Sequence, residues 1–114
     1  MLHVASPFQL DMKEKAIIES AVKGTESILK ACEESGVKKL VVTSSIVAIM
    51  DSNNMQSVFD ESHFCDPNGK GVNSYTKSKI LAEQKVWEFY KKLPNDSNLE
   101  IVTLCPGLIL GIPY

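Results

Sequence analysis

Three short stretches rich in apolar and β-branched residues, at residues 2–5, 38–45 and 99–105, are separated by longer segments. Short runs rich in Val, Ile, Leu and Thr predict β-strands. In the run 38–45 the apolar residues are continuous rather than alternating. This pattern favours a strand that is covered on both faces, as in a parallel sheet.

Residues 12–35 carry apolar side chains at a spacing close to 3.6 and predict a long helix. Asp11 can cap its start, and Gly36 stands where a left-handed residue commonly ends a helix. Gly24 in its interior is tolerated if another backbone packs close to it. The expected buried face comprises Ala16, Ile17, Ala21, Thr25, Ile28, Leu29 and Cys32.

A second helix is predicted over residues 74–92, with one face formed by Tyr75, Lys79, Ala82, Val86 and either Phe89 or Tyr90. The connection 46–73 before it is irregular, with turn signals at 51–54 and 66–71 and a short helical turn expected at 60–64. A connection of this length is usually functional or mobile.

The predicted order is strand, helix, strand, long loop, helix, strand. This order indicates two right-handed crossover units and therefore an α/β fold with a parallel sheet of about three strands. The chain has 114 residues, enough for one domain, so no second domain is expected. Three strands with apolar segments at both chain ends resemble the middle of a larger sheet.

Composition narrows the function classes. The net charge is −2 and all twelve basic residues are Lys, so we expect neither a nucleic-acid partner nor an anionic membrane surface, and no bidentate Arg contacts. The three cysteines lack metal-like spacing and are interpreted as reduced thiols. No run is long enough to span a membrane and no secretory signal is seen, so a cytoplasmic location is expected. His3 and His63 have no second ligand at metal spacing, so no metal site is expected.

The candidate chemistry lies in Tyr75 and Lys79. Residues four apart share one face of a helix, so a phenol and an ammonium point into the same small volume. An ammonium beside a phenol favours the phenolate, which makes the phenol a better proton donor. The alternative is an ordinary amphipathic helix with an exposed Lys.

Ser45 ends the second predicted strand, and ligands of open parallel sheets bind beyond the carboxyl ends of the strands. We therefore expect Ser45 to lie near Tyr75 and Lys79 and to hold a substrate carbonyl. The alternative is that Ser45 only bonds its own turn.

Several segments resemble, in order, those of extended short-chain dehydrogenases/reductases of the epimerase/dehydratase superfamily. The similarity is greatest to the dihydroflavonol-reductase and cinnamoyl-CoA-reductase-like group, which includes fungal carbonyl and methylglyoxal reductases. The segments that carry it are residues 3–7, 22–25, 40–45, 75–79 with Ala82 and Glu83, and 106–111.

The resemblance implies a partial Rossmann-type domain, the central part of an NAD(P)-binding domain, that reduces a small ketone or aldehyde. The implied cofactor is NADPH or NADH, with NADPH favoured. The catalytic residues implied are Ser45, Tyr75 and Lys79. Tyr75 and Lys79 also count among the implied cofactor contacts, together with Val4, Ala5, Ser6, Thr43, Ser44, Pro106, Gly107, Leu108 and Ile109.

The chain also departs from this pattern. The glycine-rich phosphate-binding turn G-x-x-G-x-x-G is missing ahead of Leu2, and Ala21 replaces an Asn that many members use in a proton relay. Residues 71–74 replace the Asn-Trp-Tyr-Cys-type motif of the cinnamoyl-CoA branch, which weakens the case for a CoA thioester. We therefore expect a fragment that does not bind the dinucleotide tightly by itself.

Three alternatives stay open. The first is a steroid-dehydrogenase or nucleotide-sugar-epimerase branch of the superfamily, which shares the same Ser, Tyr and Lys. The second is an inactive truncated chain that pairs with an intact relative. The third is a purely structural α/β module. Analogy with the fold also suggests a homodimer through the helices.

Overall fold

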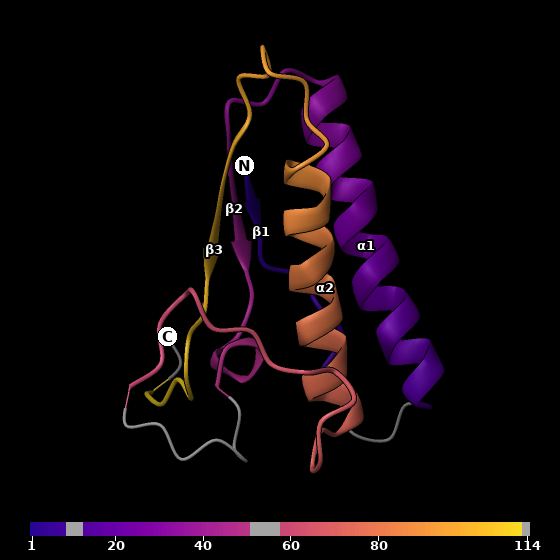
Figure 1. The fold of residues 1–114 in the computed structure, drawn as a ribbon, viewed down its shortest axis with the longest axis vertical. Helices are drawn as coiled ribbons and strands as arrows, with labels where there is room; N and C mark the ends of the chain where they lie inside the picture. Colours follow the sequence, from indigo (N-terminus) through magenta and orange to yellow (C-terminus); the bar gives the residue numbers. More distant parts are fainter. Residues whose placement is uncertain (9–12, 51–57, 113–114) are drawn as a thin grey trace.

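A computed structural model of the chain describes residues 1–8, 13–50 and 58–112 (Figure 1). Two longer helices, a short 3-10 helix and three strands follow one another along the chain. The predicted cap Asp11 and the turn at 51–54 lie outside the described residues. The elements are β1 (Leu2–His3), α1 (Glu14–Glu34), β2 (Lys39–Thr43), η1 (Ile46–Ala48), α2 (Ser74–Tyr90) and β3 (Glu100–Leu104).

The sheet confirms the predicted topology. Its three strands are parallel and stand in the order β1-β2-β3. Leu2 lies opposite Val41, which in turn lies opposite Val102. Strands and helices are each a few residues shorter than predicted, because the end residues belong to the turns that join the elements.

Both helices pack against the same face of the sheet (Figure 1). The strand order follows the chain order, so two crossovers of the same hand place α1 and α2 on one side. The core between the layers combines both helices with β2, β3 and Leu99 just before β3. It consists of Leu29, Cys32, Leu40, Val42, Val86, Leu99 and Ile101.

Within the described residues, only one of the two expected faces of residues 38–45 is covered. Lys39, Val41 and Thr43 alternate with the buried Leu40 and Val42 and face away from the helices. No helix in the described part of the chain covers that face (Figure 1). Leu2 is 72% exposed there and Val102 is 51% exposed.

Helix α1 buries five of the seven predicted residues, while Ile28 is half-buried and Ala16 is exposed. It is preceded by Lys13, which supplies no side-chain cap. Gly36 follows with φ of 66°, the left-handed conformation expected of it. A Cβ atom added at Gly24 would meet nothing within 4 Å, so no close backbone explains this glycine.

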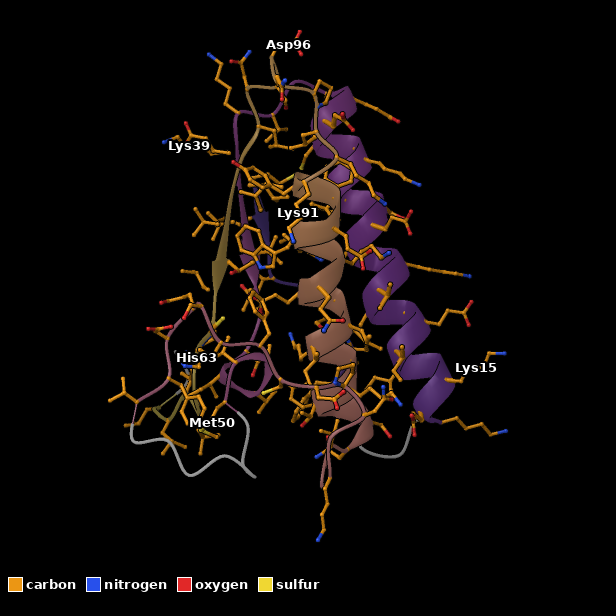
Figure 2. All side chains as sticks on the ribbon, in the orientation of Figure 1. Lys15, Lys39, Met50, His63, Lys91 and Asp96 are labelled. Atoms are coloured by element: carbon orange, nitrogen blue, oxygen red, sulfur yellow. The ribbon has the colours of Figure 1, made fainter. Side chains whose placement is uncertain are left out.

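The segment before α2 forms turns rather than the expected short helix. The Asp60 carboxylate accepts hydrogen bonds from the backbone N–H and the hydroxyl of Ser62, and the His63 N–H donates to the Asp60 carbonyl at 3.1 Å. These contacts satisfy the polar groups locally, which favours a turn. Figure 2 shows His63 and Met50 at the lower end of the molecule, with Lys39 and Asp96 at the opposite end.

Candidate functional site at the carboxyl ends of the strands

The carboxyl ends of β2 and β3 stay paired beyond the strands themselves. The Ser44 N–H donates to the Leu104 carbonyl at 2.7 Å, and the Ile46 N–H donates to the Pro106 carbonyl at 2.9 Å. Ser45 lies between these two backbone bonds. The predicted hydroxyl residue and the loop that begins at Pro106 are therefore held side by side at one edge of the sheet.

Helix α2 begins at this same edge (Figure 1). Its N-cap is Asn73, whose side-chain oxygen accepts a hydrogen bond from the Thr76 N–H at 2.8 Å. Ile80 of α2 packs against Ala48 of η1 and against Cys65, which fixes the helix start on the turn after β2. The first two turns of α2, which carry Tyr75 and Lys79, are thus positioned by a cap and by an apolar contact.

The Lys79 Nζ lies 6.0 Å from the centroid of the Tyr75 ring. Lys79 is only 7% exposed, and its ammonium donates to the Thr43 carbonyl at 3.4 Å. Burial lowers the pKa of Lys79, because it penalises the charged form. The structure therefore contradicts the alternative of an exposed Lys and keeps the ammonium next to the phenol ring.

The Tyr75 ring also contacts the loop that follows β1. The rings of Phe8 and Tyr75 meet edge to face, with centroids 5.1 Å apart and an interplanar angle of 89°. Phe8 is otherwise 69% exposed. This contact ties the predicted cofactor-facing loop to the start of α2.

Ser45 is buried, with an extended backbone, and it caps η1. Its Oγ accepts a long hydrogen bond of 3.4 Å from the Val47 N–H. Ser45 therefore does bond its own turn, as the alternative interpretation expected. The same hydroxyl still has its proton to donate, because it acts only as an acceptor in this bond.

The predicted cofactor residues fall into two groups at this edge. One group comes from β1 and β2: Ala5, Ser6, Thr43 and Ser44 line a cavity of about 20 Å³ together with Lys79, while Val4 is 65% exposed. The second group is the loop after β3, where Leu108 and Ile109 are 87% and 82% exposed, Gly107 is exposed and Pro106 is half-buried.

The sequence predicted no functional role for two residues at the site. His3 lines the same cavity, and burial together with the positive charge of Lys79 lowers its pKa. Glu83 is buried beneath the ends of β2 and β3, where the Ser44 hydroxyl donates a hydrogen bond to the Glu83 carboxylate. Glu83 stands four residues after Lys79, a spacing that could have flagged it.

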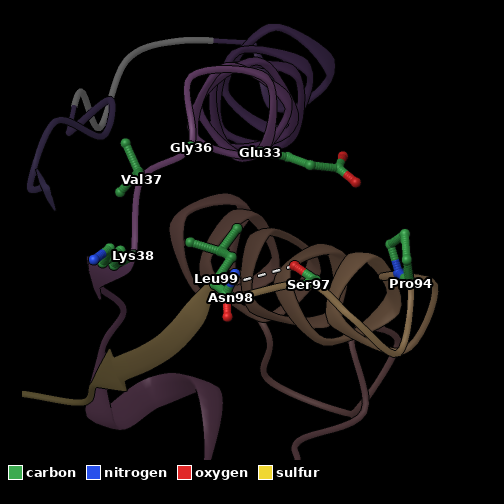
Figure 3. A pocket seen from close by; sticks show the side chains of 8 residues that line it. All are labelled: Glu33, Gly36, Val37, Lys38, Pro94, Ser97, Asn98 and Leu99. Atoms are coloured by element: carbon green, nitrogen blue, oxygen red, sulfur yellow. Dashed lines mark hydrogen bonds between the residues drawn. The ribbon is translucent and has the colours of Figure 1, made fainter.

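Two further features of the molecule hold no comparable chemistry. A hollow of about 290 Å³ lies at the other end of the strands. Glu33, Gly36 and Lys38 are among the residues that line it (Figure 3). It gathers no set of catalytic groups. Within the described residues, no cluster of three or more His, Cys, Asp or Glu side chains could hold a metal ion.

Parallel strands joined by crossover helices define a Rossmann-type α/β fold. The chain belongs to the 3-beta hydroxysteroid dehydrogenase/isomerase family, whose model matches residues 1–113. Helices long and apolar enough to cross a membrane do not occur in the described part of the chain.

The proteins that this chain is similar to include plant and yeast reductases. Cinnamoyl-CoA reductase CAD2 of Medicago truncatula is 35% identical over 97% of this chain and 35% of its own length. A bifunctional dihydroflavonol 4-reductase/flavanone 4-reductase of Malus domestica is 34% identical over 97% of this chain and 33% of its own.

The solved yeast methylglyoxal/isovaleraldehyde reductase Gre2, complexed with NADPH, matches with a TM-score of 0.79 and 30% identity, over 93% of this chain and 35% of that one. The chain thus spans about a third of the length of the relatives it matches. These matches confirm the predicted family resemblance and fold class.

Proposed function

We propose that the protein to which this chain belongs is an NAD(P)H-dependent oxidoreductase that reduces the carbonyl of a small ketone or aldehyde. The observation that carries the proposal is the buried Lys79 ammonium beside the Tyr75 ring, at the sheet edge that Ser45 also occupies. Similarity to reductases that act on carbonyl compounds supports the same reaction class.

In the proposed reaction, Ser45 donates a hydrogen bond to the substrate carbonyl oxygen and orients it. Tyr75 gives its phenolic proton to that oxygen as the carbon is reduced. The Lys79 ammonium stabilises the phenolate that remains. This attraction is strong because the dielectric constant inside a buried site is low. The reverse direction uses the same groups, with Tyr75 as the base.

The cofactor supplies or accepts the hydride when it is bound. The chemistry of the donors fits its nicotinamide end. The Lys79 ammonium has three N–H donors, of which the described residues take one, at Thr43. A second N–H can bond a ribose hydroxyl. The exposed apolar side chains of Leu108 and Ile109 offer surface for a flat ring.

The substrate class follows from what surrounds the site. The chain has no Arg to bind a carboxylate or phosphate in two-point fashion. The exposed loop 106–110 is apolar. We therefore favour an uncharged carbonyl compound, a class that includes the ketosteroids suggested by the family description, over a CoA thioester or a nucleotide sugar.

A homodimer through the helices and a cytoplasmic location complete the proposal. Half-buried apolar residues lie in the outer groove between α1 and α2, namely Ile18, Val22 and Leu81. This groove supports helix-to-helix association by analogy with the fold. The spacing of the three cysteines in the sequence is interpreted as that of reduced thiols, which suits a reducing compartment.

A second candidate is an inactive chain that pairs with an intact relative. The apolar sheet face that includes Leu2 and Val102 favours it, because exposed apolar surface of this kind is typical of association sites. Sedimentation of the chain with and without an intact reductase separates this candidate from a self-sufficient enzyme.

The test uses the product of the complete reading frame that contains residues 1–114, obtained by sequencing the full transcript. NADPH-dependent reduction of an aldehyde or ketone panel is measured for this protein and for Tyr75→Phe. We expect turnover to fall by about 10²-fold or more in Tyr75→Phe. Tyr90→Phe on the exposed part of the same helix is the matched control and keeps full activity.

Full activity of the Tyr75→Phe variant would show that Tyr75 is not the proton donor. If the transcript begins at Met1 and stops after Tyr114, and this chain neither binds NADPH nor turns over any carbonyl, catalysis is abandoned in favour of the partner-binding candidate.

A further inference from the structure

Glu83 joins three elements through one carboxylate. Its Oε2 accepts a hydrogen bond from the hydroxyl of Ser44 at the end of β2. Its Oε1 accepts hydrogen bonds from the Thr103 hydroxyl on β3 at 3.1 Å and from the Trp87 indole N–H at 3.3 Å. The Cys105 thiol lies 3.7 Å from Oε2. Glu83 is 5% exposed, so this is a buried carboxylate held by neutral donors.

Such a carboxylate is costly to bury unless its hydrogen bonds are made, and here neutral groups make them. The charge of Glu83, after burial, raises the pKa of the Cys105 thiol. Among the described residues, no ion pair links Glu83 to Lys79, although the two stand four residues apart on α2 and line the same cavity. Residues at this spacing ordinarily pair when their charges are opposite.

The missing pair matters for the ammonium. Tyr75 lies one turn before Lys79 and Glu83 lies one turn after it. A pair with Glu83 would draw the ammonium away from the phenol and toward the next turn. It would also favour the charged form of Lys79, whose pKa is lowered by burial as the site stands.

We propose that Glu83 is a positioning residue whose bonds to Ser44 and Thr103 fasten α2 to the ends of β2 and β3 and keep its carboxylate away from Lys79. The Lys79 ammonium then stays beside the Tyr75 ring. The catalytic importance of this arrangement rests on the proposed reductase function, but the arrangement itself can be tested separately.

The experiment measures the Lys79 pKa by NMR of 13C-dimethylated lysines, with the Lys79 signal assigned by Lys79→Arg. The variant Ser44→Ala/Thr103→Val removes both strand hydroxyls that hold Glu83. We expect the Lys79 pKa to rise by about 1, as the freed carboxylate pairs with it. Adding Glu83→Gln to the same variant should return the Lys79 pKa to its starting value.

Glu88→Gln is the matched control on the exposed side of α2. Glu88 pairs with Lys85 at 2.9 Å and raises its pKa. This substitution should lower the Lys85 pKa and leave that of Lys79 unchanged, which shows that the method detects a lost pair. Urea unfolding of every variant verifies that it remains folded, and single Ser44→Ala and Thr103→Val variants replace the double one if it unfolds.

An unchanged Lys79 pKa in the folded double variant, or in both single variants, overturns the proposal. A rise that Glu83→Gln does not reverse also overturns it, because the rise then has another cause. If the pKa behaves as expected but the complete protein transfers no hydride, the positioning geometry stands and the proposed function fails. If the complete protein transfers hydride but the Lys79 pKa does not shift, the function stands and the positioning role of Glu83 fails.

Discussion

The Lys79 ammonium lies 6.0 Å from the centre of the Tyr75 ring and 3.4 Å from the Thr43 carbonyl, so one side chain connects helix α2 to the end of β2. We predict that Lys79→Met in the complete protein lowers kcat by about 10²-fold or more, because the phenolate loses its neighbouring positive charge. Steady-state kinetics with NADPH and an aldehyde measures this.

Lys77→Met is the control for the loss of a lysine from the same helix. Lys77 pairs with Glu14 of α1 at 3.2 Å and should affect stability alone. Equal kcat values for Lys79→Met and the parent protein would contradict the prediction.

Burial of Lys79 also predicts how stability depends on pH. Its folded pKa lies below the ordinary 10.5, so between the two values the unfolded chain binds more protons than the folded one. The free energy of unfolding therefore rises with pH across that window, and the cost of burying the charge is full below it. Urea unfolding from about pH 7 to 10.5 should show the parent chain gaining stability relative to Lys79→Met.

Other lysines with raised pKa values, such as Lys23 and Lys85, are present in both proteins, so their contributions cancel in the comparison. Two unfolding curves that run parallel over the whole pH range would show that burial does not displace the pKa of the Lys79 ammonium.

Replacement by alanine should change the stability of the chain in opposite directions at Gly24, inside α1, and at Gly36, just after it. Gly24→Ala should stabilise the chain by about 1 kcal/mol, because the helix interior favours Ala and nothing lies within 4 Å of the added methyl group. Gly36→Ala should destabilise it by about 1 kcal/mol, because φ is +66° there. Thermal or urea unfolding of the two variants measures these changes. Opposite signs would show that the backbone conformation at each glycine, and not the loss of a glycine as such, determines the effect. Shifts of the same sign would contradict this explanation.

The core between the two layers should tolerate truncation poorly. Leu29 is fully buried between α1, β2 and α2, so Leu29→Ala should cost about 2–5 kcal/mol in unfolding free energy. Leu108→Ala removes the same atoms from a side chain that is 87% exposed and should change stability by no more than about 0.5 kcal/mol. A small effect at Leu29 would mean that the layers are not packed as described.

The local patterns of the sequence predicted every strand and both long helices, because continuous apolar runs and 3.6-residue spacing are properties of single segments. They also placed Tyr75 and Lys79 on one helix face. Of the two alternatives Phe89 and Tyr90, Phe89 packs against the core and Tyr90 is 47% exposed. The exposure of Ala16 was not predicted, since the width of a buried helix face depends on its neighbours.

The contacts around Glu83 could not be predicted for a different reason. Ser44 and Glu83 are 39 positions apart, and Thr103 is 20 positions from Glu83. Their meeting depends on the strand order and on the register of β2 against β3. The uncovered sheet face likewise depends on both crossovers lying on one side, which no single segment encodes.

That uncovered face has a consequence for the life of the chain in a cell. Val41, Val102 and Leu104 stand on a pleated surface beside an edge of β3 that no described strand covers, and surfaces of this kind invite edge-to-edge aggregation. Chaperones and proteases compete for such surfaces. Where no further segment of the protein covers this face, the amount of chain that accumulates will depend on how quickly a partner covers it after synthesis.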